Sequence, residues 1–93
     1  MDIVIWDIDA ARINDIDRNL RQAMKELGLR GQVTSMSEPP LVARMGLLGK
    51  TPVLEINSLY WSLPQGEEIT LGQCRILLFT LAMRSSGGPL KKT

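Results

Sequence analysis

Histidine is absent from this chain, and cysteine occurs once, at Cys74. A single thiol cannot form an internal disulfide, and zinc sites of the usual kind need several Cys or His ligands. Nucleophilic triads and general bases that depend on His are excluded as well. The sequence therefore predicts no metal site, no cofactor and no complete catalytic set, and we expect a protein that is not an enzyme.

A surplus of one charge is also missing, since eleven Lys and Arg stand against ten Asp and Glu. Strong nucleic-acid binders usually carry a basic surplus, so this balance argues against nucleic acid as a partner. The charges are unevenly distributed, because residues 1–17 hold five Asp and one Arg, while no acid follows Glu68. A dipolar, solvated surface is the simpler interpretation of this asymmetry.

No apolar run approaches the ~20 residues of a membrane span. Asp2 directly after Met1 does not match the basic start of a secretory signal, so we expect a cytoplasmic location without membrane partners. The length of 93 residues and the hydrophobic fraction of 44% suit one folded domain. We expect residues 1–84 to form that domain and residues 85–93 to form a flexible C-terminal tail.

A buried strand and an amphipathic helix open the chain. Ile3–Trp6 is a short apolar run rich in β-branched residues, which predicts the strand. After a loop over residues 7–12, the spacing predicts a helix over Ile13–Leu27, with Asn14 as the N-cap and Gly28 after its end. The expected apolar face of this helix consists of Ile13, Ile16, Leu20, Ala23, Met24 and Leu27.

The rest of the chain adds two helices and three strands. In chain order we expect a strand over Gln32–Met36, a short helix over Pro40–Met45, strands over Val53–Ile56 and Leu59–Leu63, and a helix from Thr70 to about Arg84. Asn57-Ser58 predicts a turn that joins the last two strands as an antiparallel hairpin. The order β-α-β-α-β-β-α indicates an α/β fold, a four-stranded mixed sheet with helices on both faces.

This order, with Thr51-Pro52 opening the third strand, resembles the thioredoxin-like fold, and the small thioredoxins most closely. The matching pieces are Ile3–Trp6, the helix that ends at Gly28, Met45-Gly46, Thr51–Asn57 and Leu59–Leu63. The resemblance covers residues 1–84. In that family the peptide bond before the matching proline is cis and lies beside the active cysteines. The resemblance therefore implies a cis bond between Thr51 and Pro52.

The chain departs from the family at the family's redox site. The positions of the two cysteines of the Cys-x-x-Cys motif are occupied here by Ala10 and Ile13. Ser58 also replaces the usual Gly of the hairpin turn. Dithiol exchange needs a thiolate and a resolving thiol, and neither is present here. The backbone before the cis proline can still pair with an extended peptide in such folds. The resemblance thus implies a redox-inactive module that binds a protein or peptide. Its candidate binding residues are Thr51, Pro52, Ala10 and Ile13.

One enzymatic alternative starts from Asp7 and Asp9, which follow the first apolar strand. This Asp-x-Asp pattern resembles the first motif of phosphotransferases of the haloacid-dehalogenase type. There Asp7 would be the nucleophile and Asp9 the acid or base, with Mg²⁺ neutralising charge. The chain lacks the later acidic pair at a strand end, so two loop acids are the simpler interpretation.

Two further alternatives involve the last helix. Cys74 lies on its apolar face, so a buried structural cysteine is favoured over a thiol enzyme that uses Cys74 alone. Tyr60 and Trp61 alternate on the preceding strand, so one of them should face a helix. Three apolar residues lie outside the main apolar face of the helix: Ile76, Phe79 and Met83. They suggest a structural homodimer through this helix as an alternative function.

Overall fold

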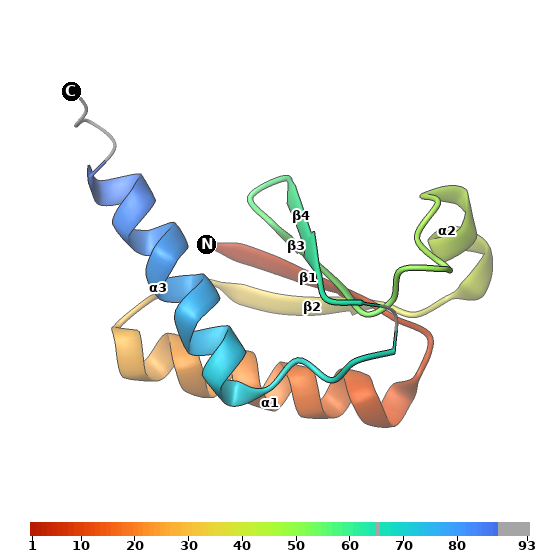
Figure 1. The fold of residues 1–93 in the computed structure, drawn as a ribbon, viewed down its shortest axis with the longest axis horizontal. Helices are drawn as coiled ribbons and strands as arrows, with labels where there is room; N and C mark the ends of the chain where they lie inside the picture. The colour runs from red at the N-terminus through yellow and green to blue at the C-terminus, as the bar shows by residue number, and fades with distance from the viewer. Residues whose placement is uncertain (65, 88–93) are drawn as a thin grey trace.

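A computed structural model describes residues 1–64 and 66–87 as an α/β fold (Figure 1). In chain order its elements are β1 (Asp2–Trp6), α1 (Ala10–Leu27), β2 (Gln32–Met36), α2 (Pro39–Arg44), β3 (Val53–Ile56), β4 (Leu59–Ser62) and α3 (Leu71–Gly87). The predicted order of strands and helices is confirmed. The bounds of β1, α2 and β4 differ from the prediction by one residue.

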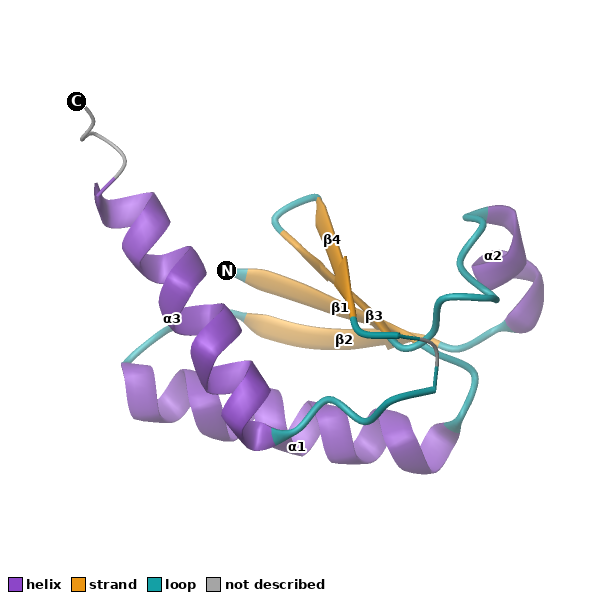
Figure 2. Cartoon of the chain, in the orientation of Figure 1, coloured by secondary structure: helices purple, strands orange, loops and turns teal. Residues whose placement is uncertain are grey.

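The four strands form one mixed sheet in the order β2-β1-β3-β4 (Figure 2). β1 and β2 run parallel, as expected for strands joined by a helical crossover, with Ile5 opposite Ser35. β3 runs antiparallel to both β1 and β4, and Leu54 lies opposite Ile5 on one side and Trp61 on the other. The predicted hairpin is therefore confirmed, and β2 and β4 are the two edges of the sheet.

The first helix begins earlier than the sequence predicted. α1 starts at Ala10, so the expectation of a loop through residue 12 was wrong, and its N-cap is Asp9 and not Asn14. The Asp9 carboxylate accepts a hydrogen bond from the backbone N–H of Arg12 at 3.0 Å. Alanine has the highest helix propensity, so Ala10 and Ala11 extend the helix without adding to its apolar face.

The other helix ends follow the expected capping chemistry more closely. Gly28 adopts a φ of 69° after α1, a left-handed conformation that glycine tolerates, as predicted. Thr70 and Gln73 cap the start of α3 reciprocally, through Gln73 N–H to Thr70 Oγ1 and Thr70 N–H to Gln73 Oε1. α3 continues to Gly87, past the predicted end at Arg84. Residues 88–93 of the predicted tail lie outside the described residues.

The main core lies between the sheet and the pair α1 and α3, which cover the same face (Figure 1). Its buried members are Ile3, Ile5, Ile13, Ile16, Leu20, Ala23, Met24, Val33, Leu54, Ile56, Ile69, Cys74 and Leu78. The opposite face has a smaller cluster, Trp6, Val42, Leu47 and Val53, where α2 and the following loop pack. Helices thus lie on both faces, but unequally. Within the described part of the chain, no helix is long and apolar enough to cross a bilayer.

Candidate functional site

The Thr51-Pro52 peptide bond is cis, as the resemblance implied. It directly precedes β3, whose first residue Val53 pairs with Trp6 at the end of β1. This antiparallel register brings the neighbouring residues, Asp7 and Pro52, to the same end of the sheet. Both side chains are fully buried. The structure therefore places the cis proline at the same end of the sheet as the start of the β1–α1 loop.

A buried ion pair organises that loop. The Asp7 carboxylate accepts hydrogen bonds from Arg12 Nε at 2.5 Å and Arg12 Nη2 at 2.7 Å, and from the backbone N–H of Ile8 at 2.8 Å. The hydrogen bond to Asp7 raises the pKa of Arg12 above its usual value. No group of three or more His, Cys, Asp or Glu side chains in the described ranges is arranged to hold a metal ion. Asp7 thus fixes the loop, while Asp9 caps α1.

The four predicted binding residues differ in accessibility. Ala10 is the exposed first residue of α1, and Ile13 lies one turn later in the main core. Thr51 and Pro52 are buried, and the Thr51 carbonyl accepts a hydrogen bond from the backbone N–H of Gly66 at 3.0 Å. The chain itself therefore uses the acceptor next to the cis proline. A peptide-binding role for these residues stays a prediction.

Cys74 is fully buried in α3, which confirms its interpretation as a structural cysteine. Burial raises the pKa of its thiol to about 11, because the thiolate would lose its hydration. The thiolate is the reactive form of cysteine, and almost none is present at neutral pH.

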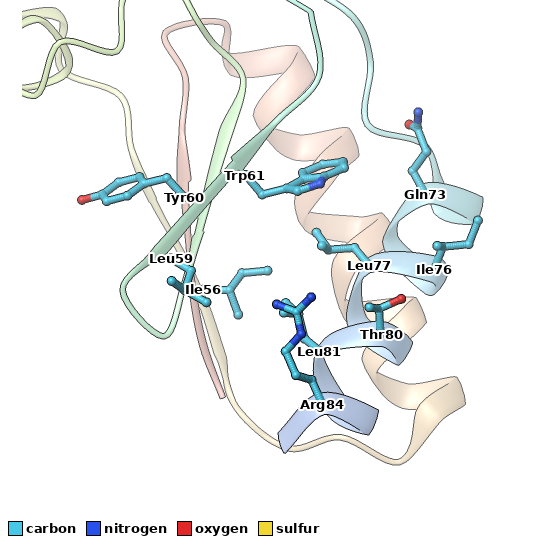
Figure 3. A pocket seen from close by; sticks show the side chains of 10 residues that line it. All are labelled: Ile56, Leu59, Tyr60, Trp61, Gln73, Ile76, Leu77, Thr80, Leu81 and Arg84. Atoms are coloured by element: carbon cyan, nitrogen blue, oxygen red, sulfur yellow. The ribbon is translucent and has the colours of Figure 1, made fainter. Parts of the chain in front are cut away.

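A different part of the molecule offers accessible surface, namely an apolar groove of about 470 Å³ between β4 and α3 (Figure 3). Leu59, Tyr60 and Trp61 contribute one wall from the strand, while Ile76 and Leu77 contribute to the other from the helix. Figure 3 shows Trp61 reaching from β4 toward α3. The sequence predicted both elements but not the groove, because it forms only when the hairpin and the last helix meet.

Exposed apolar side chains continue from the groove over the outer face of α3. Ile76 is 70% exposed, and Phe79 and Met83 are more than half exposed. Leu59 and Tyr60 add exposed apolar surface on β4. Single exposed hydrophobic residues are normal on monomers, but contiguous apolar patches mark interaction sites. We call these five residues, together with the groove, the β4–α3 surface.

The β4–α3 surface carries little charge. Arg84 is the only charged residue that lines the groove, and no carboxylate in the described ranges forms an ion pair with it. Arg75 lies on the side of α3 near α1, where it donates two hydrogen bonds to Glu26 at 2.6 and 2.9 Å. These bonds lower the pKa of Glu26 to about 2. The surface is thus apolar with one unmatched cation.

Comparisons with protein-family models, curated proteins and solved structures find no match for this chain.

Proposed function

We propose that this chain is a redox-inactive domain of the thioredoxin-like fold that acts by binding a protein through the β4–α3 surface. The fold assignment is supported by the order of elements, the mixed sheet with helices on both faces, and the cis bond at the start of β3. The resemblance of the sequence implies each of these features.

Redox inactivity follows from the residues at the two cysteine positions of the family. Ala10 and Ile13 have no thiol, and Ile13 is buried in the main core. The chain's single thiol, on Cys74, lies in α3 and is fully buried. Thiol–disulfide exchange needs an accessible thiolate, so this arrangement cannot carry it out.

The observation that carries the binding role is an apolar groove lined by the exposed residues Leu59, Tyr60 and Ile76, with further exposed apolar side chains on α3. Covering a Leu, Ile, Phe or Met side chain gains about 1.5–3 kcal/mol relative to leaving it in water. The binding of a partner that covers this surface would gain the burial free energy of several such side chains. The Thr51 carbonyl already accepts a hydrogen bond from the Gly66 N–H. The β4–α3 surface is therefore the better-supported binding site.

Site-specific photo-crosslinking tests this proposal. Benzoylphenylalanine at Ile76 should give saturable, light-dependent adducts with a protein in an extract of the host cells. The same probe at Arg18, a comparably exposed position on α1, is the matched control. Equal labelling from both positions, or none from Ile76, would overturn the binding role. Insulin reduction by dithiothreitol should stay at its background rate, and a clear acceleration by the protein would overturn redox inactivity.

A further inference from the structure

The edge of the sheet at β4 is free to pair with another strand. β4 is the last strand in the order of the sheet, and Leu59–Ser62 has no Lys or Pro, two residues that natural proteins use to block edge pairing. Asn57 and Ser58 both have positive φ, of 51° and 70°, which defines a two-residue type I′ hairpin. The ladder of such a hairpin alternates, so the N–H and C=O of Tyr60 and Ser62 point away from β3. The outer edge of β4 therefore presents hydrogen-bonding groups that another extended backbone can match in register.

The wall of the groove that α3 provides combines apolar with polar side chains, namely Ile76, Leu77, Leu81, Gln73, Thr80 and Arg84. These positions recur every three to four residues, so they lie along one side of the helix. Figure 3 shows Gln73 on the side of Trp61, at one end of the groove, and Arg84 on the side of Leu59, at the other end. The polar side chains of this wall need an occupant that has hydrogen-bonding groups of its own.

Arg84 gives one end of the groove a positive charge. It is the only charged residue that lines the groove, and none of the ion pairs between described residues includes it. A guanidinium pairs best with a carboxylate, which can accept two parallel hydrogen bonds from it. The groove therefore favours an occupant that brings a carboxylate to the end near Leu59.

We propose that the occupant is an extended peptide of the partner protein, which adds a strand to β4 and places a carboxylate against Arg84. The inference rests on the proposed function, because it names the chemistry of the partner at the same surface. In strand addition, main-chain hydrogen bonds give affinity and pockets for alternate side chains give specificity. The carboxylate belongs either to an Asp or Glu side chain or to the C-terminus of the peptide.

The dimensions of the groove fit such a strand. The helical segment from Gln73 to Arg84 rises about 16 Å, at 1.5 Å per residue. Five residues of an extended chain span about the same distance, at roughly 3.3 Å each. Figure 3 shows Trp61 reaching toward α3 and the ring of Tyr60 pointing away from it. An added strand continues this alternation, so every second side chain of the peptide would enter the groove.

Other occupants leave part of the groove unmatched. The backbone groups of a helix are bonded within the helix, and a lipid tail has no hydrogen-bonding groups, so neither pairs with the edge of β4. A second copy of this chain can offer its own β4, but the residues that line its groove include no carboxylate for Arg84. An extended peptide with an acidic group matches the strand edge, the apolar side chains and the cation together.

Selection from two synthetic libraries of random heptapeptides, one with free and one with amidated C-termini, tests the charge of the occupant. The bound sequences should have apolar residues at every second position and a carboxylate at one end. Binding from the free-acid library alone identifies the C-terminus as its source, and enrichment of Asp or Glu among the amidated peptides identifies a side chain. Arg84→Glu should weaken the binding of these peptides at least about tenfold and select Lys or Arg instead.

The matched control for this charge reversal is Arg44→Glu, because Arg44 is an exposed cation on α2, across the sheet from the groove. It should select the same peptides as the parent protein. Circular dichroism melting checks that each variant is folded.

A scan of N-methyl groups along the tightest selected peptide tests strand addition. Alternate N–H groups of an added strand bond to β4, and each methyl group removes one donor. Methylation should raise the Kd at least about tenfold at every second position and less than about twofold at the positions between, which are the matched controls. Fluorescence anisotropy measures the Kd. Tyr60→Pro should also raise it at least about tenfold, because it removes an outward N–H without breaking a bond to β3, and edge strands tolerate proline.

The outcomes separate this inference from the proposed function. The inference is overturned if neither library yields a binding peptide, if Arg84→Glu keeps the preference for acidic peptides, or if the N-methyl scan has no two-residue period. If one of these results is found while the probe at Ile76 labels a protein, the inference fails and the proposed function stands. If that probe labels nothing, the proposed function fails and the inference fails with it.

Discussion

Arg12 holds the buried carboxylate of Asp7 through two hydrogen bonds, from Nε at 2.5 Å and Nη2 at 2.7 Å. The Asp7 side chain is fully buried, while that of Arg12 is 21% exposed. The pair links the end of β1 to the first turn of α1. It therefore sets the path of the loop between β1 and α1.

Removing Arg12 should be costly, because it leaves a buried carboxylate without its cation. We expect Arg12→Gln to lower the free energy of unfolding by about 2–3 kcal/mol, measured by urea denaturation. Arg18→Gln is the control, since the pair of Arg18 with Asp15 is exposed and should contribute less than about 1 kcal/mol. Equal losses in the two variants would contradict a structural role for the buried pair.

The ion pair between α1 and α3 should make stability depend on pH in acid. Hydrogen bonds from Arg75 and Gln22 lower the pKa of Glu26 from 4.5 to about 2 in the folded protein. A carboxylate with a depressed folded pKa stabilises above its unfolded pKa, and that contribution is lost as pH falls toward the folded value. Glu26→Gln should therefore flatten the fall in melting temperature between pH 4.5 and about 2.

The control for the acid titration is Glu67→Gln, which removes an exposed carboxylate that forms no ion pair with other described residues. Its melting curve should follow that of the parent protein across the same pH range. A Glu26→Gln variant whose acid profile matches the parent would refute the role of this pair.

Alkylation should show that Cys74 is inert in the folded protein. Its pKa of about 11 leaves a thiolate fraction at neutral pH at least ~100-fold below that of an ordinary thiol with a pKa of about 8.5. Iodoacetamide should therefore modify Cys74 rapidly in denaturant and very slowly without it, as followed by mass spectrometry. Rapid modification of the native protein would mean that the thiol is accessible.

Gly31 should not tolerate a side chain. A Cβ at this position would lie 1.6 Å from the carbonyl oxygen of Met1, which accepts a hydrogen bond from the Gln32 N–H. We expect Gly31→Ala to destabilise the protein by about 2 kcal/mol, because the start of the chain must shift away from β2. Gly49→Ala is the matched control, since its Cβ would meet no atom within 4 Å and its φ is not positive. Thermal melting of both variants measures the difference.

The sequence predicted most of the fold, because the spacing of apolar residues and the residues that end helices and strands are local properties. The spacing of apolar residues in α1 and the Gly28 stop defined that helix except at its start. Asp9 and Asn14 are both acceptable N-caps in sequence, and Asp9 serves because the chain leaves β1 in the direction that Asp7 and Arg12 fix. That choice depends on a tertiary contact, which local patterns do not contain.

The candidate site was predictable only in part, for a similar reason. The spacing of Ile76, Phe79 and Met83 indicated apolar residues outside the buried face of α3, and the structure exposes all three. The groove also needs Leu59 and Trp61, which approach α3 only through the fold of the hairpin. The hydrogen bond that occupies the Thr51 carbonyl likewise joins residues that are distant in sequence.

The hydrogen bond between Gly66 and Thr51 has a consequence for binding beside the cis proline. An intramolecular donor competes with an incoming substrate at an effective concentration of roughly millimolar. An extended peptide that pairs with the Thr51 carbonyl would therefore have to compete with the Gly66 N–H.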